Sequence, residues 1–143
     1  MLSYRLTHPQ ILAALAAAGH GSQILIADGN YPFSTGANPA AERVYLNLTR
    51  GSSPADEVLA VIADSIVIEA AHVMVPDDGP EPPIFESFRK SLPKGVELER
   101  LGRFRFYAAA RERDVALVIA TGEQRIYANI LLTIGVIPPD DAA

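Results

Sequence analysis

Apolar residues in this chain gather into short runs, and turn-forming or charged residues separate the runs from one another. Short apolar runs bounded by turn residues are typical of strands that are buried in a sheet. We predict such strands at 24–27, 44–48, 66–75, 115–120 and 128–136. Residues 96–101 instead alternate apolar and charged side chains, which predicts a strand with one exposed face.

Helical patterns lie between several of these strands. In the first helix, Thr7 is the expected N-cap, Pro9 lies in the first turn, and Gly19 ends the helix as a glycine in the left-handed conformation commonly does. A second helix begins at Ser53 and Pro54, a cap followed by proline. Its expected buried face is Val58, Leu59 and Ile62. Further helices are predicted at 84–92 and 102–113.

This alternation of strands and helices predicts an α/β layered fold. Residues 29–42 and 76–83 are rich in turn-forming residues and are expected to be loops. The first of these loops is long for a compact domain, a feature that often accompanies function. The sequence contains neither an internal repeat nor a linker, so residues 1–143 are expected to form one domain, with 138–143 as a flexible tail.

Composition narrows the class of protein. The net charge is −5 and no segment is rich in lysine and arginine, which argues against a nucleic-acid partner. No apolar run approaches the roughly 18 residues of a membrane span. The alanine-rich segment 11–18 resembles a secretory signal, but we interpret it as a helix. The absence of cysteine excludes disulfides and thiolate metal sites and is compatible with a cytoplasmic protein.

The chemistry of the chain centres on residues 19–33. His20 precedes the buried strand 24–27, and Asp28 follows it. In an open α/β sheet, ligands bind beyond the carboxyl ends of the strands, which is where Asp28 lies. Purely structural roles are also open: His20 can contact a helix end, and Asp28 can close a turn. Whether the two side chains share a site is the question that the pattern raises.

Two sequence motifs resemble those of one known family. The run 19–32, Gly-His-Gly-Ser-Gln-Ile-Leu-Ile-Ala-Asp-Gly-Asn-Tyr-Pro, is similar to the start of the RbsD/FucU family of D-ribose pyranases and L-fucose mutarotases. Residues 121–132, Thr-Gly-Glu-Gln-Arg-Ile-Tyr-Ala-Asn-Ile-Leu-Leu, resemble the second signature of that family. Because both motifs occur in the same order and at similar spacing, the resemblance covers nearly the whole chain.

The resemblance implies a fold, an activity and a set of site residues. The fold is a three-layer α/β/α domain around a mixed or mostly parallel sheet. The activity is cofactor-free interconversion of the ring forms of a reducing monosaccharide by general acid–base catalysis. His20 and Tyr127 match catalytic positions, and Asp28 and Asn129 match sugar-binding positions. Histidine suits proton transfer because its reference pKa lies near neutrality.

One further position concerns the choice of sugar. In the family that the chain resembles, ribose pyranases have a histidine at the start of the helix after the fifth strand. Fucose mutarotases have an arginine there, within Asn-Arg-Phe-x-Phe-Tyr. Here residues 102–107 read Gly-Arg-Phe-Arg-Phe-Tyr, which makes Arg103 the expected sugar contact. The following stretch is about two residues longer than expected for the family, which leaves Arg105 as the alternative. The pattern favours L-fucose or a related sugar.

Partners and competing functions follow from the same residues. The resemblance implies a homo-oligomer, built as a ring, in which the site is shared between subunits. The apolar segment 130–134, too hydrophobic for a free edge strand, agrees with this.

The scattered histidines lack the spacing of a metal site, so no metal is expected. The competing function is a non-catalytic sugar-binding or transport-accessory protein, for which His20 would need no proton chemistry.

Overall fold

The computed structural model describes residues 1–141, in which strands and helices alternate along most of the chain. The strands are β1 (Gln23–Ala27), β2 (Glu42–Tyr45), β3 (Ile68–Val75), β4 (Leu98–Gly102), β5 (Val115–Ala120) and β6 (Ile130–Ile134). The helices are α1 (Pro9–Ala17), α2 (Ala55–Ala63), α3 (Ile84–Ser91) and α4 (Arg103–Ala110), followed by a 3₁₀ turn η1 (Pro139–Asp141).

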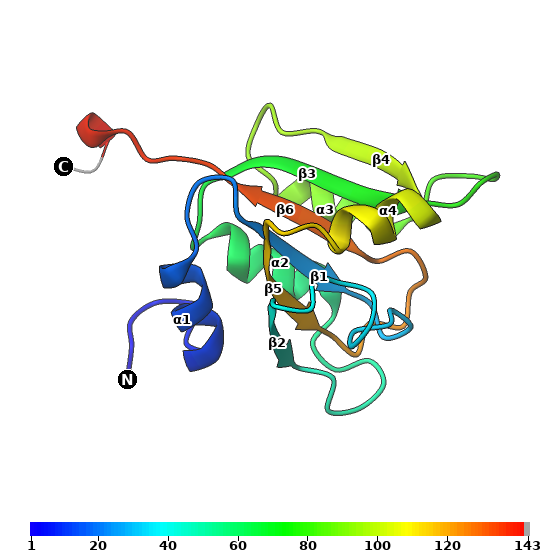
Figure 1. Cartoon of the computed structure of the whole chain (residues 1–143), viewed down its shortest axis with the longest axis horizontal. Helices are drawn as coiled ribbons and strands as arrows, with labels where there is room; N and C mark the ends of the chain where they lie inside the picture. Colours follow the sequence, from blue (N-terminus) through cyan, green and yellow to red (C-terminus); the bar gives the residue numbers. More distant parts are fainter. Residues whose placement is uncertain (142–143) are drawn as a thin grey trace.

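The six strands form one sheet in the order β2-β5-β1-β6-β3-β4 (Figure 1). The pairs β2–β5, β5–β1 and β3–β4 are parallel, whereas β6 runs antiparallel to both of its neighbours, β1 and β3. The sheet is therefore mixed, as expected. Strand β1 lies near its centre, so the polar residues at the two ends of β1 are held by a buried strand.

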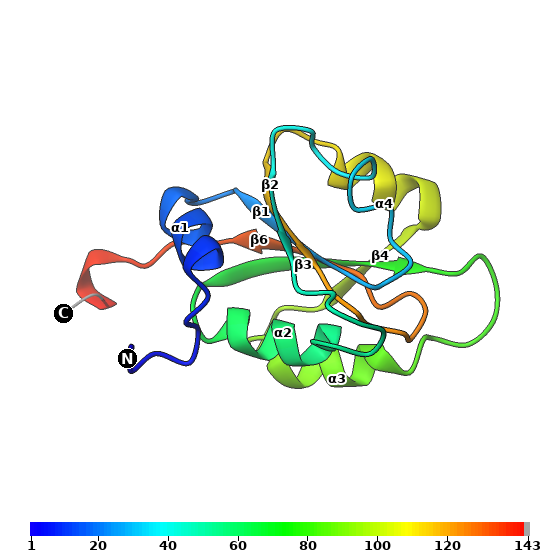
Figure 2. The ribbon, with the colours of Figure 1, turned by 90° about the horizontal axis from the view of Figure 1, so that it is seen from below.

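Helices cover both faces of this sheet (Figure 2). Helices α2 and α3 lie against one face, where the larger cluster of buried side chains includes Leu59, Phe85 and Phe88. Helix α4 and the loop between β1 and β2 lie against the other face, where Phe106 and Tyr31 join a smaller cluster. The three-layer α/β/α prediction is confirmed.

The ends of α1 differ from the sequence prediction. Its N-cap is His8, not Thr7, and the His8 Nδ1 accepts a hydrogen bond from the Ile11 N–H at 3.4 Å. The helix ends at Ala17, and Gly19 is not in the left-handed region; the glycine with positive φ, 87°, is Gly21. The Gly21 N–H donates to the carbonyl of Ile134, so this glycine makes the turn that carries the chain into β1.

Four strands, β2, β3, β4 and β6, are shorter than predicted, and the apolar character of β6 has a different cause from the one expected. Strand β2 lies at Glu42–Tyr45 instead of 44–48, and β6 begins at Ile130 instead of Ala128. The apolar segment of β6 is explained within the chain, because β6 pairs on both sides with β1 and β3. Its hydrophobicity therefore gives no support to an oligomer.

The remaining segments are α4 and the C-terminal end of the chain. Within α4, Phe106 is fully buried and Phe104 is exposed. Within the predicted tail, residues 139–141 form the 3₁₀ turn, while 142–143 lie outside the described residues. No helix in the described part of the chain is both long and apolar enough to span a bilayer.

Candidate functional site

Asp28 is held in a buried position where β1 ends. Its backbone N–H donates to Asn129 Oδ1 at 2.7 Å, and Asn129 Nδ2 donates to Asp28 Oδ2 at 3.2 Å. The backbone N–H groups of Asn30 and Ala128 also donate to the carboxylate. These bonds join the two sequence motifs directly, because Asp28 belongs to the first and Asn129 to the second.

Burial and hydrogen bonding act against each other on this carboxyl group. Asp28 is only 3% exposed, and burial raises the pKa of its carboxyl group above the ordinary value by more than the hydrogen bonds from Asn30, Ala128 and Asn129 lower it. An acid in this environment accepts hydrogen bonds from a sugar hydroxyl when ionised and gives a proton when neutral.

Tyr127, close in sequence to the residues that bind Asp28, has an unusual backbone conformation. Its φ is +58°, in the left-handed region that a residue with a Cβ rarely occupies. Tyr127 directly precedes Ala128 and Asn129, whose N–H and side chain bind Asp28. Positive φ in a non-glycine residue is most often found where the surrounding structure enforces it, and such residues cluster at functional sites.

A hollow of about 350 Å³ opens between these residues and α4. It is lined by Asp28, Asn30, Tyr31, Met74, Arg103, Tyr107, Ile126, Tyr127 and Asn129. Four of the five site residues predicted from the sequence therefore border one cavity: Asp28, Arg103, Tyr127 and Asn129. The cavity combines a carboxylate, an amide, a guanidinium and phenols with the apolar Met74 and Ile126, a set suited to a small polyhydroxylated molecule.

Arg103, and not Arg105, borders the hollow. It is the first residue of α4, and its Nε donates to the Tyr107 hydroxyl at 3.4 Å. Its guanidinium also lies over the rings of Phe104 and Tyr107, at 5.5 and 5.6 Å from the centroids. These contacts hold an exposed side chain at the rim of the cavity.

Two tyrosines that the sequence analysis left out complete the wall. The Tyr31 hydroxyl donates to the carbonyl of Gly36 at 2.6 Å, and burial raises the pKa of Tyr31. Its ring meets that of Tyr107 edge to face at 5.4 Å. Tyr31 stands in the first motif and Tyr107 in the aromatic run after Arg103, so their place in those motifs was the signal available.

His20 lies at the opposite end of β1 from this hollow. The five residues of β1 separate the turn that carries His20 from Asp28. At about 3.3 Å per residue, such a strand spans roughly 16 Å, too far for both side chains to touch one small molecule. Within one chain, the structure does not bring His20 together with the other four predicted residues.

The partner of His20 is Glu69, which the sequence analysis missed. His20 Nε2 lies 3.2 and 3.1 Å from the two carboxylate oxygens of Glu69. Both side chains are about half exposed, at 58% and 44%. With Nε2–H donated to the carboxylate, Nδ1 is the ring nitrogen left to exchange protons.

The local backbone turns Glu69 towards His20. The register of β3 against β6 moves from Ile68–Ile134 to Ala70–Thr133, so Glu69 is the extra residue of a β-bulge. A Cβ at Gly135 would lie 3.3 Å from the Cβ of Glu69 and 3.0 Å from Val67 Cγ1, so a larger residue at this position would crowd Glu69. A bulge depends on strand pairing, so no local sequence pattern revealed it.

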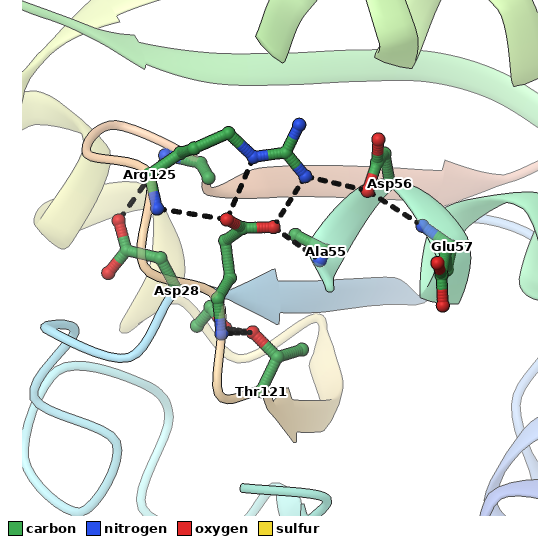
Figure 3. A network of polar contacts seen from close by, with 9 residues as sticks. Asp28, Ala55, Asp56, Glu57, Thr121 and Arg125 are labelled. Carbon is green, nitrogen blue, oxygen red and sulfur yellow. Dashed lines mark hydrogen bonds and ion pairs between the residues drawn. The ribbon is translucent and has the colours of Figure 1, made fainter. Parts of the chain in front are cut away.

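An ion pair between the buried Glu123 and the half-exposed Arg125 fixes the second motif against α2 (Figure 3). The Glu123 carboxylate accepts hydrogen bonds from the backbone N–H and the Nε and Nη2 of Arg125, and from the N–H of Ala55 at the start of α2. Arg125 also contacts Asp56 at 2.8 Å. Burial raises the pKa of Glu123, but these hydrogen bonds outweigh it and lower the pKa to about 2.

Glu123 also touches the first motif through its backbone. Its carbonyl accepts the N–H of Gly29 at 2.8 Å, and a Cβ at Gly29 would lie 3.0 Å from the same oxygen. The turn after Asp28 and the segment before Tyr127 are therefore in direct contact. Among residues 1–141, no group of three or more histidine, aspartate or glutamate side chains is arranged to hold a metal ion.

Comparison with known proteins gives this geometry a context. The model of the RbsD / FucU transport protein family matches residues 1–137. A fucose mutarotase from Bos taurus is 35% identical over 144 aligned residues, covering 95% of this chain and 93% of that protein. Proteins called D-ribose pyranase are also among the relatives.

Solved structures agree with the fold. The chain superposes on Bacillus subtilis RbsD complexed with D-ribose with a TM-score of 0.81 and 25% identity, covering 96% of this chain and 100% of that one. It also superposes on the fucose mutarotase of Streptococcus pneumoniae in complex with L-fucose, with a TM-score of 0.77 and 27% identity, covering 92% and 94%.

Proposed function

This chain belongs to the RbsD / FucU transport protein family, and on that premise we propose that it is an isomerase that interconverts the anomers and ring forms of L-fucose or a closely related sugar. We also propose that residues 1–143 form a single mutarotase domain and that the protein is cytoplasmic, as expected from the sequence. The observation that carries it is the hollow that Asp28, Arg103, Tyr127 and Asn129 line together.

The reaction needs only proton transfers. A base takes the proton from the anomeric hydroxyl, an acid protonates the ring oxygen, and the bond between the anomeric carbon and that oxygen breaks to give the open-chain aldehyde. Rotation exposes the other face of the carbonyl, and the reverse transfers close the ring. Positioned acid–base groups contribute typically 10²–10⁴-fold to such a step.

His20 and Tyr127 are the proposed proton carriers. His20 exchanges a proton through Nδ1 while Glu69 holds Nε2, and the Tyr127 hydroxyl serves the opposite side of the ring. Asp28 and Asn129 bind sugar hydroxyls, and Arg103 contacts the substituent that distinguishes one sugar from another. No cofactor enters this scheme.

Since His20 and the hollow lie at opposite ends of β1, the proposed site needs two chains. The His20–Glu69 pair of one subunit would meet the hollow of the next. A contact of this head-to-tail kind generates a closed ring when the rotation between subunits closes. The proposal is therefore a ring-shaped homo-oligomer with shared sites.

Saturation-transfer NMR with a panel of reducing sugars tests the function, because it reports binding and anomer exchange in one measurement. We expect L-fucose to exchange fastest and His20→Asn to lower the exchange rate at least tenfold while sugar binding persists. Binding without accelerated exchange in the parent protein would identify a sugar-binding protein instead of an enzyme.

A further inference from the structure

A second hollow, of about 330 Å³, borders the same turn as the proposed sugar site. The two cavities share Asn30, but the second is lined by the segment that follows β2 and by the 121–124 segment, not by α4. Its volume is close to that of the first hollow. The proposed mutarotase reaction uses none of its other side chains.

The frame of this hollow is tightly built. The Gly51 N–H donates to the Gly122 carbonyl at 2.7 Å, and the Gly122 N–H donates to the Ser52 carbonyl at 2.9 Å. A Cβ at Gly122 would lie 2.7 Å from that Ser52 oxygen, so the two segments touch through their backbones. Ser52 Oγ closes the loop further by accepting the Thr49 N–H.

The side chains around the opening are polar and have no partner inside the described part of the chain. Asn30, Asn47, Arg50 and Gln124 line the hollow and are exposed, and none of their side chains makes a hydrogen bond or ion pair with residues 1–141. Glu123, the acid that also lines it, is already paired with Arg125. Arg50 is therefore the uncompensated charge at this opening.

These groups define a chemical class of ligand. Carboxamides donate and accept hydrogen bonds, as the hydroxyls of a sugar require, and a guanidinium binds a phosphate or carboxylate through two parallel hydrogen bonds. The volume suits one sugar ring. We propose that this hollow is a second binding site, for a monosaccharide that carries an anionic group such as a phosphate, with Arg50 on the anion and the amides on the hydroxyls.

Titration calorimetry of the native assembly tests the proposal with glucose 6-phosphate, glucose and inorganic phosphate as probes. We expect one glucose 6-phosphate per chain, bound at least tenfold more tightly than either glucose or phosphate. Arg50→Gln should weaken glucose 6-phosphate at least tenfold, and Asn47→Ala should weaken it severalfold. Arg113→Gln, an exposed arginine that lines a different hollow, is the matched control and should leave the affinity unchanged.

Several results would overturn this inference. If phosphate binds as tightly as the sugar phosphate, the hollow holds an adventitious ion only. Absence of saturable binding, or equal weakening by Arg50→Gln and Arg113→Gln, would remove the site. Because Arg50 and Asn47 lie outside the proposed sugar cavity, anomer exchange of L-fucose should persist in both variants, so the two proposals can fail separately.

Discussion

Asp28 shows how one side chain serves both packing and binding. Its two oxygens accept three hydrogen bonds, from the N–H groups of Asn30 and Ala128 and from the Asn129 amide. Oδ2 accepts two of these bonds and Oδ1 only one, so Oδ1 keeps a free lone pair, because a carboxylate offers about four acceptor sites in all. The residue can therefore join the two motifs and still accept hydrogen bonds from a ligand.

Asp28→Asn is expected to weaken sugar binding at least tenfold. The amide loses the charge that strengthens hydrogen bonds from hydroxyls, and its NH₂ group faces a donor wherever it points. A buried donor left without an acceptor costs about 1–3 kcal/mol, so the melting temperature should fall as well. Binding by NMR titration and thermal unfolding measure the two effects. If the variant is destabilised but its sugar affinity is unchanged, Asp28 has only a structural role in the turn.

A contribution of the His20–Glu69 pair to catalysis can be distinguished from a contribution to sugar binding. Glu69→Gln keeps a hydrogen-bond acceptor for His20 Nε2 but removes the negative charge that stabilises a protonated ring. We expect kcat for anomer exchange to fall about tenfold with little change in KM, because Glu69 contacts His20 and none of the proposed sugar-binding residues.

Glu97→Gln is the matched control for this substitution, since Glu97 is also exposed but lies outside the His20 contact. Its exchange rate should equal that of the parent. An equal loss of kcat in both variants would point to net charge instead of the His20–Glu69 contact. A rise in KM alone for Glu69→Gln would contradict a role in proton transfer.

At the scale of elements, the segment from Thr121 to Asn129 is a connector held at both ends. Thr121 donates through Oγ1 to the carbonyl of Ala27 at 2.7 Å, and Asn129 binds Asp28. Between them, Glu123 joins the segment to the N-terminus of α2, where a negative charge is favoured by the helix dipole. The loop carrying Tyr127 is therefore held by three contacts, two at the end of β1 and one at the start of α2.

Glu123 should make the free energy of unfolding depend on pH in the acidic range. Because its folded pKa of about 2 lies below the ordinary value of 4.5, its contribution is full above pH 4.5 and is lost as the pH falls towards 2. The shift corresponds to at most about 3 kcal/mol, since one pKa unit is about 1.4 kcal/mol.

Glu123→Gln should therefore destabilise the protein at pH 7 and flatten the dependence of unfolding free energy between pH 4.5 and 2. Denaturant unfolding at a series of pH values measures this. Glu57→Gln, on an exposed carboxylate of α2 outside the ion pair, is the control. A parent curve that is flat over the same interval would refute the assigned pKa shift.

At the scale of the molecule, the sheet separates the groups that the proposed reaction needs. Strand β1 places His20 at one end and Asp28 at the other, and Glu69 accompanies His20. Arg103 and Ile126 border the hollow, and Ile126 is exposed, as is Phe104, the residue next to Arg103 in the sequence. In the proposed assembly, a neighbouring subunit would therefore pack against exposed apolar side chains beside a polar cavity.

Subunit mixing tests this shared site. His20→Ala and Tyr127→Phe subunits are each expected to be nearly inactive alone. After exchange into mixed assemblies, some sites would hold an intact His20 from one chain and an intact Tyr127 from the next, so part of the anomer exchange should return. Light scattering checks the assembly, and isotope-labelled mass spectrometry checks the exchange. No recovery after verified exchange, or an active monomer, would place the whole site in one chain.

Local sequence determined much of this protein. The apolar runs at 24–27 and 115–120 became β1 and β5, because these features depend on neighbours in sequence, and α2 begins at Ala55, one residue later than predicted, with Pro54 as its N-cap in place of Ser53. The two motifs indicated Asp28, Tyr127 and Asn129, and the run 102–107 indicated Arg103, all of which line one cavity in the structure.

Tertiary structure decided what depends on distant contacts. The central place of β6 follows from pairing with β1 and β3, which no property of residues 130–134 specifies. The bulge that turns Glu69 towards His20 exists only because β3 and β6 pair. The separation of His20 from Asp28 follows from β1 running straight between them: sequence placed both residues near one strand, and only the extended backbone put them at opposite ends.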